Sequence, residues 1–101
     1  MPLTIGTIQT FPNVRADKSQ IVKIIEEASE VLNEWKQLCG AQSKIVTCIE
    51  CTYKCGTFDN CISEIADTIQ ACANLASALG VDDMRDAMSA CEERNRARGR
   101  L

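Results

Sequence analysis

The stretch that decides the fold runs from residue 17 to residue 38 and reads DKSQIVKIIEEASEVLNEWKQL. Its apolar side chains recur every three or four residues, which is the spacing of one face of an α-helix. Asp17 is a favourable N-cap, Gln20 completes a capping-box pattern three residues later, and Gly40 is expected to end the helix. The apolar positions are Ile21, Ile24, Ile25, Ala28, Val31, Leu32, Trp35 and Leu38.

Two more helices follow the same reasoning. One is predicted over residues 60–79, with Gly80 as its terminator, and the other over residues 83–97, with Asp82 as its N-cap. Three to four helices of this length leave a bundle incomplete. We therefore expect an all-α fold whose bundle is completed by oligomerisation, as a homodimer or a homotetramer.

The segments outside these helices have a different composition. Residues 1–16 contain β-branched residues, two prolines and a glycine, and read as an irregular N-terminal arm. Residues 43–60 form a Cys-rich insertion between the two acidic helices, expected as a loop or a short hairpin. The 101 residues carry no internal repeat, which favours a single domain over residues 1–101.

Composition excludes several classes of function. A formal net charge of −3 argues against a nucleic-acid partner, which would need a basic face. No apolar run approaches the ~20 residues that span a bilayer, and the first residues lack the features of a secretory signal, so a cytoplasmic protein without a membrane partner is expected. The chain has no histidine, which removes Ser–His and Cys–His pairs.

Four carboxylates are the main candidates for chemistry. Glu27 and Glu30 are spaced i, i+3 on the first helix, and Glu64 and Asp67 have the same spacing on the second. Each pair therefore shares one helix face. If the helices pack together the charges converge, and two like charges about 4 Å apart repel by roughly 4 kcal/mol at an effective dielectric of 20. A hard divalent cation such as Mg²⁺ offsets that repulsion, so these four residues are the predicted metal ligands.

Cations and an aromatic ring accompany the acids. Lys23 and the arginines of residues 94–100 can bind phosphate oxygens, and Trp35 can stack on a nucleobase. Simpler roles stay open for each of them. Lys23 can pair with Glu27 at i, i+4, Trp35 can belong to the core or an interface, and basic residues at a helix C-terminus favour the helix dipole.

The cysteines of the insertion have no single interpretation. Four thiolates from Cys48, Cys51, Cys55 and Cys61 can form a closed tetrahedral zinc site of structural type. The spacing is not that of a standard zinc ribbon, and the favoured alternative is a set of small buried hydrophobic residues and free thiols. A redox switch through Cys48 and Cys51 is a third option.

The ordered set of motifs resembles a known family. The acids stand in the strings EEASE at residues 26–30 and EIAD at residues 64–67, and the last helix closes with NRARGR at residues 95–100. This order, EExxE followed by ExxD, is similar to the MazG-like, all-α nucleoside triphosphate pyrophosphohydrolase superfamily. That superfamily includes the all-α dUTPases, dCTP pyrophosphatases and phosphoribosyl-ATP pyrophosphohydrolases. The resemblance covers residue 17 to the C-terminus.

The resemblance implies Mg²⁺-dependent hydrolysis of a nucleoside triphosphate between its α and β phosphates, giving the monophosphate and pyrophosphate. It places Asn95, Arg96 and Arg98 near the substrate phosphates, and it assigns the metal to the same four carboxylates. Two alternatives stay open. One keeps the chemistry but acts on phosphoribosyl-ATP, and the other is a non-catalytic helical module that binds zinc or a partner.

Overall fold

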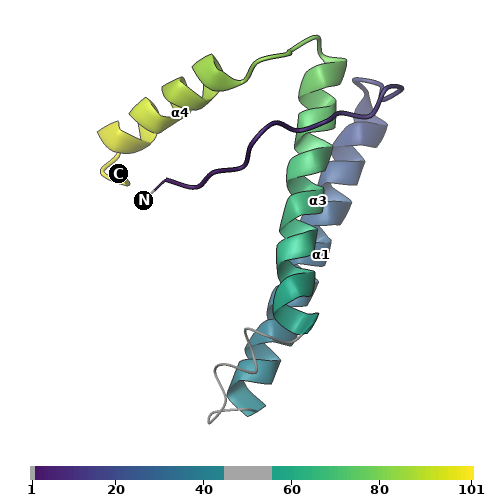
Figure 1. The fold of residues 1–101 in the computed structure, drawn as a ribbon, viewed down its shortest axis with the longest axis vertical. Helices are drawn as coiled ribbons and strands as arrows, with labels where there is room; N and C mark the ends of the chain where they lie inside the picture. The colour runs from purple at the N-terminus through teal and green to yellow at the C-terminus, as the bar shows by residue number, and fades with distance from the viewer. Residues whose placement is uncertain (1, 45–55) are drawn as a thin grey trace.

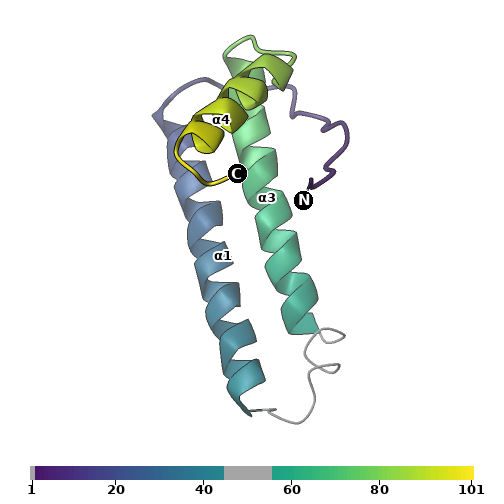
Figure 2. The same ribbon diagram turned by 90° about the vertical axis from the view of Figure 1, so that its left-hand side faces the viewer.

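The structure, a computed structural model, describes residues 2–44 and 56–101. Within these residues it contains three α-helices and no strand, which confirms the all-α prediction. They are α1 (Lys18–Lys44), α3 (Gly56–Ala78) and α4 (Arg85–Ala97). Figures 1 and 2 show α1 and α3 side by side and antiparallel, while α4 projects away from the end of α3.

The start of α1 agrees with the sequence in part. Asp17 is the N-cap, because its Oδ1 accepts hydrogen bonds from the backbone N–H of Ser19, at 3.0 Å, and from the Ser19 hydroxyl. The predicted capping box is not formed. Gln20 does not reach back but crosses to α3, where its Nε2 donates to the carbonyl oxygen of Ala71 at 2.9 Å. This buried bond ties the two helices together.

The predicted end of α1 is also wrong, because the helix continues through Gly40 to Lys44. A glycine inside a helix costs only about 1 kcal/mol relative to alanine, and the following Ala-Gln-Ser-Lys contains good helix formers. Gly40 has no positive φ that would turn the chain out of the helix. The glycine therefore weakens the helix without ending it.

Gly80 ends α3 as predicted. Its φ of 89° lies in the left-handed region, its N–H donates to Ser77 O at 2.9 Å, and Val81 N–H donates to Ala76 O at 3.0 Å. These two bonds are the Schellman pattern, which satisfies carbonyl groups left over at the helix end. Gly99 repeats the pattern after α4, with a φ of 73°.

The start of α4 corrects another expectation. The N-cap residue is Met84, not Asp82, and its side chain makes no capping bond, whereas Asp83 Oδ1 accepts a hydrogen bond from the Arg85 N–H at 2.9 Å. The Arg85 guanidinium closes on the same carboxylate at 2.7 Å. The helix thus begins two residues later than expected, and Asp83, just before the N-cap, accepts from its first free N–H group. α4 has no buried residue, and it makes no close contact with α1 or α3.

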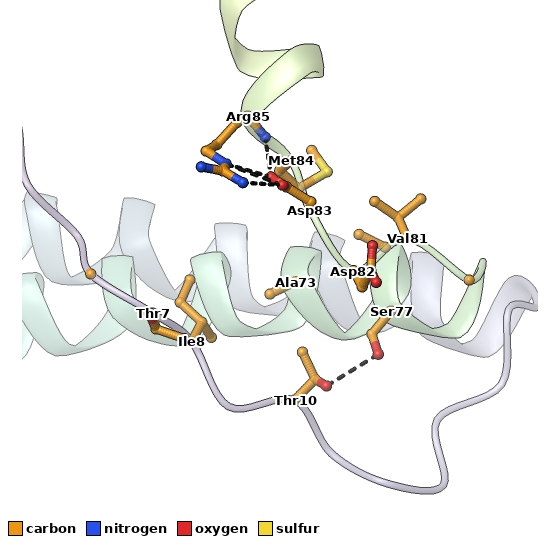
Figure 3. A pocket seen from close by; sticks show the side chains of 13 residues that line it. Thr7, Ile8, Thr10, Ala73, Ser77, Val81, Asp82, Asp83, Met84 and Arg85 are labelled. Atoms are coloured by element: carbon orange, nitrogen blue, oxygen red, sulfur yellow. Dashed lines mark hydrogen bonds and ion pairs between the residues drawn. The ribbon is translucent and has the colours of Figure 1, made fainter.

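The N-terminal arm is docked along α3 by three side chains one or two turns apart. Gln70 Nε2 donates to Gln9 O at 2.8 Å, Phe11 N–H donates to Asn74 Oδ1 at 3.0 Å, and Thr10 Oγ1 donates to Ser77 Oγ at 3.1 Å. Figure 3 shows the last of these bonds at the edge of a cavity of about 770 Å³ between the arm, α3 and the start of α4. The arm thus has a defined position without regular secondary structure.

On one side of the α1–α3 pair each helix carries a row of apolar side chains that is largely exposed, although Ile69 and Ala76 are half-buried beside the N-terminal arm. We call these two rows the apolar stripes. Both rows have the three- and four-residue spacing of helix packing seams. At about 100° per residue, the stripe of α1 and its Glu27 and Glu30 lie on opposite sides of the line that faces α3. The stripe of α1 is Ile21, Ile25, Ala28, Leu32 and Trp35, and that of α3 is Ile62, Ile65, Ile69, Cys72 and Ala76, followed by Leu79.

The Cys-rich insertion falls mainly on residues 45–55, outside the described residues. The predicted hairpin and three of the four candidate zinc ligands, Cys48, Cys51 and Cys55, lie there. The fourth, Cys61, is buried in α3.

The left-handed conformation of Gly80 can be tested by substitution. A Cβ added there would meet no atom within 4 Å, so the cost of Gly80→Ala comes from the backbone alone. We expect a loss of about 1–2 kcal/mol in the free energy of unfolding, measured by urea denaturation. Gly80→Asn should lose less, because asparagine tolerates this conformation. Equal losses for the two variants would contradict the assignment.

Candidate metal centre and cavity

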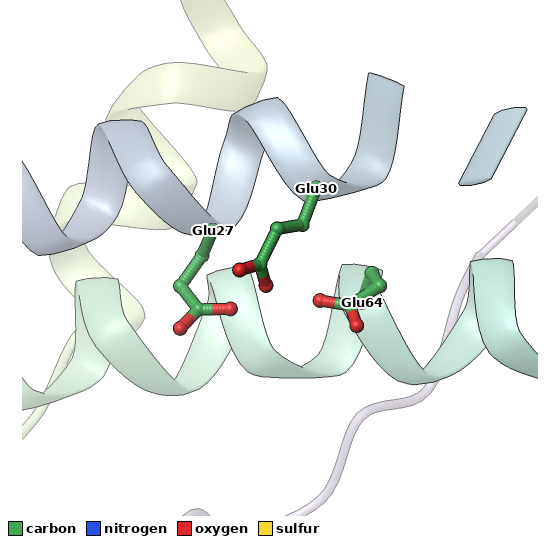
Figure 4. A group of neighbouring side chains, drawn as sticks. All are labelled: Glu27, Glu30 and Glu64. Carbon is green, nitrogen blue, oxygen red and sulfur yellow. The ribbon is translucent and has the colours of Figure 1, made fainter. Parts of the chain in front are cut away.

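Three carboxylates from the two long helices converge at the α1–α3 interface. One carboxyl oxygen from each of Glu27, Glu30 and Glu64 lies within 4.8 Å of the other two. Figure 4 shows Glu27 and Glu30 descending from α1 towards Glu64 on α3. The i, i+3 spacing on α1 and the antiparallel packing of α3 are together enough to produce this meeting.

Two oxygens of this group are buried without a partner. Glu27 is only 7% exposed. Its Oε1 forms an ion pair with Lys23 Nζ at 2.7 Å, and its Oε2 has no hydrogen-bond partner. Glu64 Oε2 is likewise buried and unpaired. Leaving a buried acceptor unsatisfied costs free energy, more so when it is charged, and native structures rarely do it. Both unpaired oxygens belong to the converging group, so each has a lone pair free to accept a hydrogen bond or bind a cation.

The charges of the group perturb one another. The pKa of Glu30 is raised to about 7, first by the hydrogen bond it shares with Glu64 and then by the negative charge of Glu27. The pKa of Glu27 is lowered, mainly because Lys23 donates a hydrogen bond to it. Close to neutral pH the group therefore retains a proton on Glu30. A divalent cation would compete with that proton for the same oxygens.

Asp67 lies one helical turn after Glu64 and is not within the group of three. It lines a cavity of about 550 Å³ together with Glu27 and Lys23. The predicted fourth ligand thus shares a space with Glu27, while Glu30 and Glu64 do not line it. Oxygen ligands in this number and at this density suit Mg²⁺, which keeps several waters and takes one or two carboxylates directly.

The remaining predicted substrate residues are placed elsewhere. Trp35 is 52% exposed and belongs to the apolar stripe of α1. On α4, Asn95 lies near Cys91 and accepts a hydrogen bond from Arg100, and Arg96 pairs with Glu92 at 3.6 Å. Since α4 makes no close contact with α1 or α3, a single chain does not bring Asn95, Arg96 and Arg98 to the carboxylates.

Sequence reasoning missed the polar wall of the cavity. Beside Lys23, Glu27 and Asp67, the lining includes the amides Gln20, Gln70 and Asn74, with Phe11 from the arm. The i, i+4 spacing of Gln70 and Asn74 was visible in the sequence. Nothing in the periodicity of the helices indicated that the arm would return to them.

No family model, curated protein or solved structure matches this chain. Among the helices that the structure describes, none is both long enough and apolar enough to cross a membrane.

The raised pKa of Glu30 predicts a pH-dependent stability for the metal-free protein. Its ordinary pKa is 4.5, so at Glu30 the folded state binds more protons than the unfolded state up to about pH 7. The contribution of Glu30 to stability should therefore be lost as pH rises through this window. Thermal unfolding of the wild type and of Glu30→Gln from pH 4.5 to 8, without metal, should show a steeper fall for the wild type. Parallel curves would show that Glu30 is not perturbed.

Metal binding itself is a second prediction. Mg²⁺ or Mn²⁺ should raise the melting temperature, and by more at pH 8 than at pH 5.5, where Glu30 holds a proton. Glu64→Gln should abolish the rise, whereas Glu93→Gln, on the exposed surface of α4, should leave it intact. A rise that is the same in both variants would place the ion elsewhere.

Proposed function

We propose that this protein is a Mg²⁺-dependent nucleoside triphosphate pyrophosphohydrolase, which cleaves its substrate between the α and β phosphates. The observation that carries the proposal is the convergence of Glu27, Glu30 and Glu64, with two buried unpaired oxygens, at the edge of a cavity of about 550 Å³. The choice of reaction rests on the resemblance of the EExxE and ExxD strings to the MazG-like superfamily.

The chain's own residues have distinct tasks in this proposal. Glu27, Glu30, Glu64 and Asp67 would hold Mg²⁺. When bound, Mg²⁺ neutralises phosphate charge and lowers the pKa of a coordinated water, so no protein nucleophile is needed. Lys23 already neutralises part of the acidic charge through Glu27, and its side chain is 54% exposed. It can thus turn from the carboxylate to a phosphate oxygen at the mouth of the cavity.

The proposal extends to a second copy of the chain. The surface area of 8054 Å² exceeds the roughly 5,700 Å² that the size scaling gives for a compact monomer of 11.1 kDa. The radius of gyration of 16.6 Å likewise exceeds the roughly 13 Å expected for a compact chain of 101 residues. Isologous pairing through the apolar stripes would form a four-helix bundle and bury much of the excess.

Pairing also gives α4 a role. Met84, the residue just before α4, and Met88 within it are 45% and 58% exposed, and α4 itself makes no close contact with α1 or α3. In an oligomer they can pack on the partner. The carboxylates of the partner would then be within reach of three α4 residues that do not reach those of their own chain, Asn95, Arg96 and Arg98.

Activity provides the direct test. With Mg²⁺ and a panel of ribo- and deoxynucleoside triphosphates, the wild type should release pyrophosphate and the monophosphate. Glu64→Gln and Asp67→Asn should each lower kcat/KM by at least about 100-fold, since even the partners of metal ligands cost 10–100-fold when removed. Glu93→Gln is the matched control. Release of inorganic phosphate instead of pyrophosphate would reject the cleavage position.

The two alternatives separate in the same experiments. Turnover of phosphoribosyl-ATP but of no nucleoside triphosphate would favour the phosphoribosyl-ATP pyrophosphohydrolase. Calorimetry that detects neither Mg²⁺ nor a non-hydrolysable nucleotide, with stoichiometric zinc by elemental analysis, would favour the non-catalytic module.

The oligomer has its own test. Leu32→Glu places a charge in the middle of the apolar stripe of α1, which should shift the protein to a smaller species in light scattering after size exclusion. Asn33→Glu, on the adjoining exposed surface, should leave the mass unchanged. An unaltered mass for Leu32→Glu would show that the stripe is not the interface.

A further inference from the structure

The cavity beside the carboxylates has a wall whose polar groups point to a ligand other than a metal. Asn74 is 3% exposed, and both of its recorded hydrogen bonds end on the same oxygen. Phe11 N–H donates to Asn74 Oδ1 at 3.0 Å, and Gln70 Nε2 donates to it at 3.0 Å. Because a backbone N–H can only donate, the oxygen and nitrogen of this amide are assigned without ambiguity.

This arrangement leaves the Asn74 amide nitrogen as a fixed donor. Its Nδ2 group makes no hydrogen bond within the described residues, although the side chain lines the cavity. Gln20 is complementary, since one hydrogen of its Nε2 is bound to Ala71 O, which fixes the amide and leaves its Oε1 as an acceptor. The wall therefore presents a held donor and a held acceptor, each on a buried side chain. Mg²⁺ could not bind the Asn74 donor, so a donor beside an acceptor fits an organic ligand better than a bare cation.

Phe11 adds an apolar surface to the same cavity. Its backbone is fixed by Asn74, and Pro12 after it favours an extended conformation at residue 11. Its side chain is nevertheless 59% exposed. An aromatic ring held by its backbone but left open on one face suits stacking on a flat ring.

We propose that this cavity is the nucleoside subsite of the protein, in which Phe11 stacks on the base and Asn74 Nδ2 donates to an acceptor on the base edge. Gln20 Oε1 accepts from a neighbouring donor on that edge. The inference rests on the proposed hydrolase for its substrate class. The volume of about 550 Å³ lies within the range of small-molecule sites, and the base would lie next to the carboxylates that carry the phosphate chemistry.

The most selective variant is Asn74→Asp. Aspartate retains the oxygen that Phe11 and Gln70 use, so the arm stays docked, while the Nδ2 donor is lost. Phe11→Leu keeps an apolar side chain and the backbone bond but removes the aromatic face. Thr10→Val serves as the control, because it removes an arm-to-α3 hydrogen bond that lies outside this cavity. Circular dichroism and thermal unfolding of all three variants show whether the fold is retained.

Two measurements are made on each protein. The first is binding of unphosphorylated nucleosides (adenosine, guanosine, cytidine and uridine) by saturation-transfer NMR without metal, which does not depend on catalysis. We expect at least one nucleoside to bind, about tenfold more weakly to Asn74→Asp and at least about fivefold more weakly to Phe11→Leu, with Thr10→Val like the wild type. The second is hydrolysis with Mg²⁺, where KM for the preferred nucleotide should rise by similar factors and kcat should change little.

The outcomes distinguish the two proposals. If nucleosides bind through Asn74 but no pyrophosphate is released, the subsite stands and the hydrolase fails. If nucleotides are hydrolysed but Asn74→Asp and Phe11→Leu leave every KM and every nucleoside affinity unchanged, the subsite is overturned and the hydrolase stands. Absence of nucleoside binding to the wild type also overturns the subsite. If Asn74→Asp unfolds, Phe11→Leu decides alone, because its exposed side chain does not support the fold.

Discussion

The convergence of like charges between α1 and α3 is the constraint on which the rest of the structure depends. Two helices with few buried apolar residues, Leu38, Cys61 and Ala71 among those described, bring Glu27, Glu30 and Glu64 together at their interface. Among the described residues, Lys23 pairs with Glu27, and the raised pKa of Glu30 favours a proton on that carboxyl. A pair of helices with so small a core cannot easily sustain an uncompensated acidic interface. The site and the stability of the fold are therefore coupled.

The two sides of the α1–α3 pair have separate tasks. One carries the carboxylates and the cavity, and the other carries the apolar stripes. This division follows from helical geometry, because residues three or four apart share a face while the next ones turn away. A second copy could therefore cover the apolar side without obstructing the cavity. It also explains why Trp35, which belongs to the apolar stripe of α1, is not on the side of the carboxylates.

Much of the fold could be predicted because its determinants are local. Apolar spacing located the three helices, and Asp17 and Gly80 marked ends through their own backbone chemistry. The prediction that Gly40 ends α1 was wrong, because a glycine ends a helix only where the backbone also turns out of it. The capping box predicted for Gln20 failed for a different reason, because its side chain has a tertiary partner, Ala71 O, that no local pattern reveals.

The candidate site was likewise predictable only where its determinants are local. The spacing of Glu27, Glu30 and Glu64 placed each on a helix face, and packing of two helices was enough to join them. The amide wall depends on the return of the N-terminal arm, a contact between residues more than 60 positions apart in the sequence. Such a contact is set by a few hydrogen bonds, so it leaves no periodic trace.

The manner in which the arm is held has an evolutionary consequence. The side chains of Gln70 and Asn74 hydrogen-bond to the main chain of residues 9 and 11, and neither bond involves the side chain at those positions. Position 11 can therefore drift among many amino acids, proline excepted because it lacks the N–H, while the arm keeps its place. A lineage descended from this chain could exchange one residue and acquire a different molecular preference, with the helices and their acids inherited unaltered.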